Sequence, residues 1–200
     1  MKIIGISGSA PGGSSTDILI KAVLEGALSI TSGGDIKTVF YRLNEKKIMP
    51  CQACGKSPEP EFCFFHDDMD ELYNAMQKAD GIIFGSPIYF DSVSAQAKLF
   101  IDRTNCLRPA DFSDPSGQTF KPPRLKGKKG GIILVAGERE KFDSAFRTAR
   151  GFYIWAGIDI VFELTFRTKS LAAGEAKNDN DKLMEAAECG KKLVEAIMEK

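Results

Sequence analysis

The sequence predicts an α/β fold in three layers: a doubly wound, five-stranded parallel sheet with helices on both faces. Five short runs rich in β-branched and apolar residues are spaced along the chain, and amphipathic segments of helical periodicity alternate with them. Strands that alternate with helices pair in parallel and are buried on both faces. The first run also enters a loop of Ser, Gly and Pro that opens a helix, which is how α/β folds make an anion site.

The apolar runs mark five strands, which we expect at 3–6, 36–41, 82–86, 131–136 and 158–164. One helix is expected to follow the first loop, with Ile18, Leu19, Ala22 and Val23 as its apolar positions, and the others at 69–79, 94–104, 142–155 and 181–199. Five such units match the flavodoxin-like architecture. Its ligand sits beyond the carboxyl ends of the strands.

Length and composition indicate a single domain over 1–200, with insert loops at 42–67 and 105–127. A third long polar connection covers 167–180, and loops of this length are functional or mobile. Basic and acidic residues number 27 each, so the net charge is zero and no nucleic-acid partner is indicated. No apolar run is long enough to span a membrane.

The N-terminus enters a strand at once, which leaves no room for a signal peptide. Five cysteines, three of them clustered, do not resemble the disulfide framework of a secreted protein. We therefore expect a cytoplasmic protein.

The loop after the first strand predicts a phosphate site. It carries the hydroxyls of Ser9, Ser14, Ser15 and Thr16 among several glycines, just before a helix. The first turn of a helix offers unpaired backbone N–H groups and the positive end of the dipole. The spacing fits neither the P-loop nor the dinucleotide fingerprint. No Lys or Arg lies between Lys2 and Lys21, which suits a terminal phosphate monoester. An ordinary helix cap is the alternative interpretation.

A second loop follows the strand at 82–86 and reads GSPIYFDSVSAQAKLFIDR. Pro87 stiffens the turn, and Tyr89 and Phe90 bring aromatic surface to the carboxyl end of the strand. Because parallel strands end at one rim, this aromatic surface and the phosphate loop predict a planar ligand that carries a phosphate. The alternative is that the two aromatic residues cap the core.

The two stretches GISGSAPGGSST and ADGIIFGSPIYFDSVSAQAKLFIDR together resemble the NAD(P)H-dependent FMN reductases of the flavodoxin-like superfamily. The resemblance is good over 1–105 and returns in the last helix. It implies that the FMN phosphate binds Ser9, Ser14, Ser15 and Thr16, that Pro87, Ile88, Tyr89 and Phe90 contact the flavin ring, and that Ala136, Gly137 and Glu138 approach its other edge. Many relatives carry an Arg in the first loop where this chain has Pro11, which removes a cation near the phosphate.

The cysteine-rich stretch around Cys51, Cys54 and Cys63 resembles the compact motif of the iron–sulfur flavoproteins, a branch of the same superfamily. That motif has four cysteines, and Ser57 stands at the third position here, which argues against a [4Fe–4S] cluster. With His66 the three cysteines also form a C-x2-C-x8-C-x2-H pattern that suits zinc. We favour a third interpretation, a loop that has lost its cluster and holds no metal.

The resemblance implies an FMN-dependent NAD(P)H oxidoreductase that works by a ping-pong mechanism. Its acceptor is a quinone, a free flavin, a nitroaromatic compound or a metal ion. The alternative is an FMN electron-transfer protein of the iron–sulfur flavoprotein type, with a degenerate or absent cluster and a redox protein as partner. A sensor of a phosphorylated metabolite is a third class. The relatives form homodimers or homotetramers, and 105–127 is the expected contact. The sequence does not choose between NADH and NADPH.

Overall fold

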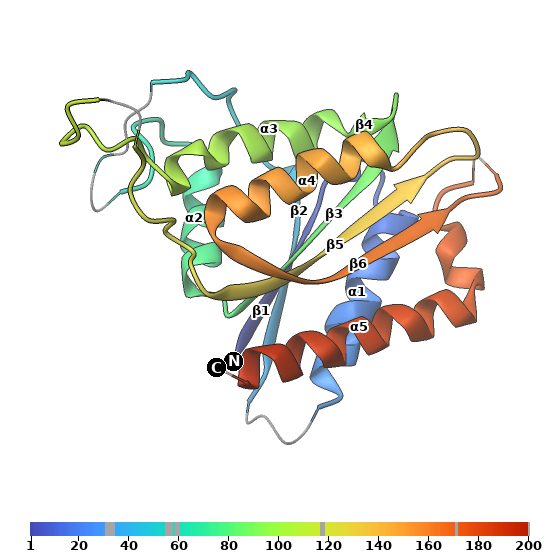
Figure 1. The fold of residues 1–200 in the computed structure, drawn as a ribbon. Coiled ribbons are helices and arrows are strands. Elements are labelled where there is room, and N and C mark those ends of the chain that lie inside the picture. The colour runs from blue at the N-terminus through green and yellow to red at the C-terminus, as the bar shows by residue number, and fades with distance from the viewer. Residues whose placement is uncertain (31–34, 55–57, 59–60, 117–118, 171, 200) are drawn as a thin grey trace.

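The computed structural model describes all of the chain except 31–34, 55–57, 59–60, 117–118, 171 and 200. Five strands pair in parallel in the order β2-β1-β3-β5-β6, which confirms the predicted sheet (Figure 1). They are β1 (Lys2–Ser7), β2 (Lys37–Arg42), β3 (Gly81–Tyr89), β5 (Lys128–Ala136) and β6 (Ile158–Arg167). A two-residue strand that the sequence did not predict, β4 (Ser92–Val93), pairs antiparallel with the end of β3.

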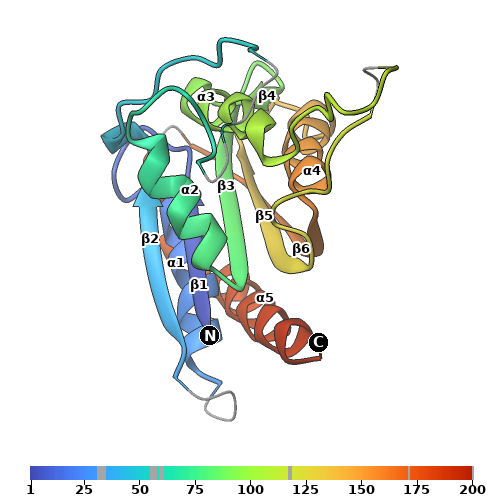
Figure 2. The ribbon, with the colours of Figure 1, turned by 90° about the vertical axis from the view of Figure 1, so that its left-hand side faces the viewer.

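In the part of the chain that the structure describes, five α-helices cover the two faces of this sheet. They are α1 (Ser15–Leu28), α2 (Met69–Lys78), α3 (Ala95–Arg103), α4 (Asp143–Ala156) and α5 (Asn180–Met198). Helices α1 and α5 lie on one face, and α2, α3 and α4 lie on the other (Figures 1 and 2). The described connections contain the short 3₁₀ turns η1 (Leu43–Glu45), η2 (Thr104–Leu107) and η3 (Glu175–Asn178).

The sheet separates two hydrophobic cores, because successive side chains of a strand point to opposite faces. In β1, Ile3 packs into the core beneath α1 and α5, whereas Ile4 and Ile6 pack into the core beneath α2, α3 and α4. All three side chains are fully buried. This burial on both faces explains why the strand reads as a continuous apolar run rather than as an alternating pattern.

Helices α1 and α5 cross in close contact through two glycines. A Cβ atom on Gly26 would lie 2.0 Å from the carbonyl oxygen of Ala187, and one on Gly190 would lie 2.0 Å from that of Val23. Only glycine therefore lets the two backbones approach this closely. The contact fixes the helix whose first turn faces the carboxyl rim of the sheet.

The two insert segments lie together near the C-terminal end of α3 (Figure 1). The guanidinium of Arg124 donates to the carbonyl of Glu61 at 2.8 Å, which links one segment to the other. Trp155 in α4 donates from its indole nitrogen to the carbonyl of Asn105 at 3.0 Å. Among the described residues, no helix has both the length and the apolar character needed to cross a bilayer.

Candidate functional site

The loop between β1 and α1 lies at the point where the strand order reverses, because the chain leaves β1 for β2 on one side while β3 lies on the other. Ser14 caps α1: its hydroxyl accepts a hydrogen bond from the backbone N–H of Asp17 at 3.2 Å. The helix then begins at Ser15, so the N–H groups of its first turn point out of the helix end toward the rim. This geometry favours an anion.

The end of β3 supplies the second side of the site. Ser94, which caps α3, donates from its hydroxyl to the carbonyl of Gly8 at 2.6 Å and so ties this region to the first loop. A Cβ atom on Gly8 would lie only 2.7 Å from that of Ala97, so glycine is required for this close approach. Phe90 and Asp91 have φ angles of 53° and 58°, a left-handed conformation that is strained for a bulky side chain.

The loops that follow β5 and β6 supply the third side. The guanidinium of Arg167 donates to the carbonyls of Gly137, Glu138 and Glu140 and so holds the β5–α4 loop. The loop after β6 folds back over α1. There, Gly174 has a φ of +75°, and a Cβ atom on it would lie 2.6 Å from the carbonyl oxygen of Gly13.

These segments enclose one cavity of ≈ 260 Å³. Of the predicted cofactor-binding residues, the cavity is lined by Ser9, Ser14, Ser15, Thr16, Pro87, Ile88, Tyr89 and Gly137. Phe90 is not among its lining residues, because the strained turn leaves this side chain fully exposed at the rim. Sequence reasoning missed the contribution of the β6–α5 connection, which adds Thr168, Ser170, Ala172, Ala173 and Gly174. Its length and polar composition were the available signal.

The donor set of this cavity fits the phosphate of FMN. Four serine and threonine hydroxyls line one side of it next to the first turn of α1. The hydroxyl of Ser15 accepts from the N–H of Ala176 at 3.1 Å, so its own proton is directed elsewhere. Tyr89, half exposed, adds an aromatic surface on the β3 side. A cradle of hydroxyl and N–H donors beside an aromatic wall suits a planar ligand with a terminal phosphate.

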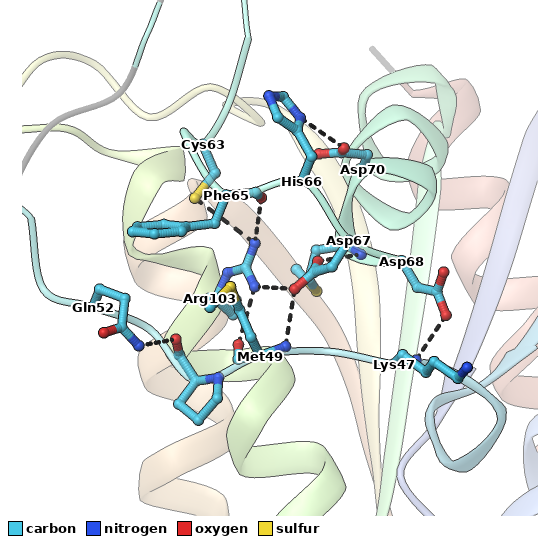
Figure 3. A network of polar contacts seen from close by, with 12 residues as sticks. Lys47, Met49, Gln52, Cys63, Phe65, His66, Asp67, Asp68, Asp70 and Arg103 are labelled. Carbon is cyan, nitrogen blue, oxygen red and sulfur yellow. Dashed lines mark hydrogen bonds and ion pairs between the residues drawn. The ribbon is translucent and has the colours of Figure 1, made fainter.

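The residues that line this cavity do not include the cysteine-rich loop. A buried cation, Arg103, organises that loop (Figure 3). Arg103, at the end of α3, donates to the Asp67 carboxylate at 2.5 Å and to the carbonyls of Met49 and Phe65, both at 3.0 Å. Burial alone would raise the pKa of Asp67. The hydrogen bonds from Arg103 and from backbone N–H groups outweigh that effect and lower it. The network fixes the loop against α3.

A second cavity of ≈ 270 Å³ lies beside this network, and Cys51, Cys54, Cys63 and Cys106 all line it. Thiol groups are suitable ligands for iron and zinc. Within the described part of the chain, no group of three or more His, Cys, Asp or Glu side chains lies close enough together to hold one metal ion. The prediction for Ser57 lies outside the described residues.

The structure does not bring His66 to the cysteines. Its imidazole turns toward Asp70, with 3.0 Å between the ring nitrogen Nδ1 and the carboxylate oxygen (Figure 3). The hydrogen bond with Asp70 raises the pKa of this exposed histidine. Cys63 instead accepts a hydrogen bond from Arg103, with 3.7 Å between Nη2 and Sγ. The C-x2-C-x8-C-x2-H pattern therefore does not form a tetrahedral arrangement in this structure.

Comparison with known proteins gives a family and a set of relatives. The model of a family described as NADPH-dependent FMN reductase matches residues 1–166. The iron-sulfur flavoprotein of Methanosarcina thermophila is 33% identical over 199 residues, which cover 98% of this chain and 95% of that protein. Iron-sulfur flavoprotein MJ1083 of Methanocaldococcus jannaschii is 32% identical over 204 residues, with 98% and 97% covered.

Solved structures share the fold. A flavone reductase superposes with a TM-score of 0.69 at 23% identity over 99% of this chain, which spans 63% of that protein's length. An NADH:FMN oxidoreductase in its apo form gives a TM-score of 0.60 at 19% identity, covering 95% of this chain and 88% of that one. These likenesses support the flavodoxin-like fold.

Proposed function

The chain belongs to the NADPH-dependent FMN reductase family, and we propose that it oxidises a reduced nicotinamide dinucleotide and passes the electrons to a small acceptor, with FMN bound at the carboxyl rim. The acceptor is a quinone, a free flavin, a nitroaromatic compound or a metal ion. One observation carries the proposal: the hydroxyl-rich first turn of α1 and the aromatic end of β3 line the same cavity. This is where a doubly wound sheet binds its ligand.

In this proposal the chain binds and orients, and the cofactor supplies the redox chemistry. Bound FMN would supply the chemistry of hydride transfer from a reduced nicotinamide and of electron transfer to an acceptor. Ser9, Ser14, Ser15 and Thr16 hold the phosphate. Pro87, Ile88 and Tyr89, which line the same cavity, would contact the ring, and Gly137 would approach its other edge. Phe90, exposed at the rim, borders the face where the donor and the acceptor bind in turn. No protein acid or base is required.

The direct test is to titrate the apo-protein with FMN and then mix the complex anaerobically with NADH or NADPH. We expect saturable binding, followed by loss of the flavin absorbance with at least one nucleotide. The Thr16→Val variant should weaken FMN binding. Ser92→Ala, in the short strand β4 and outside the cavity lining, is the control and should not. A flavin that neither nucleotide reduces would refute the reductase role.

An electron carrier between redox proteins is the second candidate, of the iron–sulfur flavoprotein type with a degenerate or absent cluster. The observation that favours it is the cysteine-lined cavity, where Cys106 joins the three loop cysteines. Iron, sulfide and zinc contents of anaerobically purified protein test this candidate. Metal that is lost in Cys106→Ser and retained in Cys189→Ser would support it, because Cys189 lies in α5 and outside that cavity. Less than about a tenth of an equivalent of either metal would show that the cavity holds no cluster. The carrier role itself would be refuted by rapid oxidation of NADH or NADPH in the presence of a small acceptor.

We also propose a homodimer or homotetramer in which 105–127 supplies part of the contact. Phe112 and Phe120 in this segment are 68% and 47% exposed, and apolar side chains of this size gain stability when a partner covers them. Light scattering after size exclusion tests the proposal. A monomer at micromolar concentration would refute it.

A further inference from the structure

An acidic side chain lies next to the anion site, and this raises an electrostatic problem. Asp17 belongs to the first turn of α1, and its side chain is only 2% exposed. A phosphate bound at the same helix end would lie close to this carboxylate, and two negative groups at short range repel each other. The loop itself offers no compensation, because no Lys or Arg lies between Lys2 and Lys21.

The hydrogen bonds of Asp17 hold its carboxylate under the loop. One carboxylate oxygen accepts from the hydroxyl of Ser7 at 2.5 Å, and the other accepts from the backbone N–H of Gly13 at 3.0 Å. Both donors are neutral, so they position the carboxylate without cancelling its charge. The positive charge that offsets this carboxylate comes from strand β2.

Arg42, the last residue of β2, supplies that cation. Its Nε lies 3.2 Å from Oδ2 of Asp17, and its Nη2 donates to the carbonyl oxygen of Ala10 at 2.8 Å. The guanidinium also lies against Gly12, where a Cβ atom would be 3.4 Å from Nη1. The remaining partner is Glu45, which is 62% exposed and accepts from Nη1 at 2.5 Å. Arg42 thus contacts the first loop at Ala10 and Gly12 and, at the same time, the buried carboxylate of Asp17 in α1.

We propose that Arg42 is the positioning residue that makes the first loop selective for a phosphorylated flavin. Its guanidinium offsets the negative charge of Asp17 beneath the anion site, and it holds the first loop through the carbonyl of Ala10. The proposal rests on the FMN site proposed above and deepens it. A cation from the end of β2 thus supplies the positive charge that the first loop lacks. The contribution of Arg42 to affinity should therefore depend on the phosphate of the ligand and not on its flavin ring.

The test compares the dissociation constants of FMN and riboflavin, which differ only in the phosphate. The variants are Arg42→Met, Arg42→Lys, Asp17→Asn and the double variant Asp17→Asn/Arg42→Met. Arg150→Met is the matched control. Arg150, in α4, forms an ion pair with Glu163 in β6 and is not among the residues that line the cavity. Quenching of flavin fluorescence gives each constant at low and high salt, and thermal melting in the absence of flavin shows that each variant folds.

Arg42→Met should weaken FMN binding at least tenfold and riboflavin binding less than threefold. Arg42→Lys should retain most of the FMN affinity. The double variant should recover most of it too, because removing Asp17 removes the charge that Arg42 offsets. Arg150→Met should change neither constant. High salt should change the gap between the FMN affinities of Arg42→Met and the wild type only slightly, since a buried charge such as that of Asp17 is screened much less than an exposed one.

Two results would overturn the inference while leaving the proposed function intact. One is an equal loss of FMN and riboflavin affinity in Arg42→Met, which would make Arg42 a general brace of the loop. The other is a double variant as weak as Arg42→Met, which would show that Arg42 does not act through Asp17. A wild-type protein that binds neither flavin would overturn the proposed function and this inference together.

Discussion

Glycine-to-alanine substitutions can test how closely the loop after β6 packs on the first loop. Gly174 has a φ of +75°, and its Cβ would lie 2.6 Å from the Gly13 carbonyl. A left-handed alanine costs about 1–2 kcal/mol, and the overlap adds about 1–3 kcal/mol. Gly174→Ala should therefore lower the free energy of unfolding by about 2–5 kcal/mol. Gly13 has a φ of +69°, and nothing lies within 4 Å of a Cβ atom built on it. Gly13→Ala should therefore lower the free energy of unfolding only by the backbone strain, about 1–2 kcal/mol.

Gly151→Ala is the matched control. This glycine lies exposed inside α4 with nothing within 4 Å of a Cβ atom, so alanine should stabilise the helix by about 0.5–1 kcal/mol. Urea unfolding without flavin measures all three differences, and an FMN titration should show the largest loss of affinity for Gly174→Ala. If Gly174→Ala proved no less stable than Gly13→Ala, the close approach of the two loops would be refuted.

Three further predictions concern charge, thiol reactivity and strain. Folding lowers the pKa of Asp67, so its ion pair with Arg103 should stabilise the fold fully at pH values above the unfolded pKa of about 3.9. This stabilisation should be lost as the pH falls through the folded pKa. The urea midpoints of the wild type and Asp67→Asn should therefore converge in acid. Iodoacetamide at pH 8 should label exposed Cys54 before Cys106, whose pKa burial raises to about 11, and peptide mapping would show the opposite order if this is wrong. Phe90→Gly should stabilise the fold by about 1 kcal/mol by relieving a φ of 53°, while slowing nicotinamide oxidation; an unchanged melting temperature would contradict the strain argument.

Regular elements could be predicted closely because their signal is local. The run of isoleucines in β1 is apolar on both faces, and the spacing of Met69, Leu72 and Met76 is helical; the structure contains both elements. The strand β4 was missed because two residues carry no periodicity. Its turn was also hidden, since Phe90, unlike Asp91, is not a residue that typically adopts positive φ.

The candidate site divides in the same way. The hydroxyls around Ser14 and the aromatic residue Tyr89 were visible as local patterns next to predicted strand ends, and the structure lines one cavity with both. The contribution of Gly174 was not visible, because it depends on a loop that returns over α1 from the far edge of the sheet. The orientation of His66 away from Cys63 was equally inaccessible, since spacing in a loop does not fix where side chains point.

The sequence by itself determined the five parallel strands and the helices between them, and it predicts a phosphate-bearing ligand at the carboxyl rim, because periodicity and helix-start chemistry act over a few residues. Only the tertiary structure decided which distant groups meet there. Arg42 lies 25 residues after Asp17 in the chain, yet sheet pairing of β2 with β1 places its guanidinium 3.2 Å from that carboxylate. Such contacts depend on strand order and register, which link residues through the packing of the whole sheet rather than through local sequence.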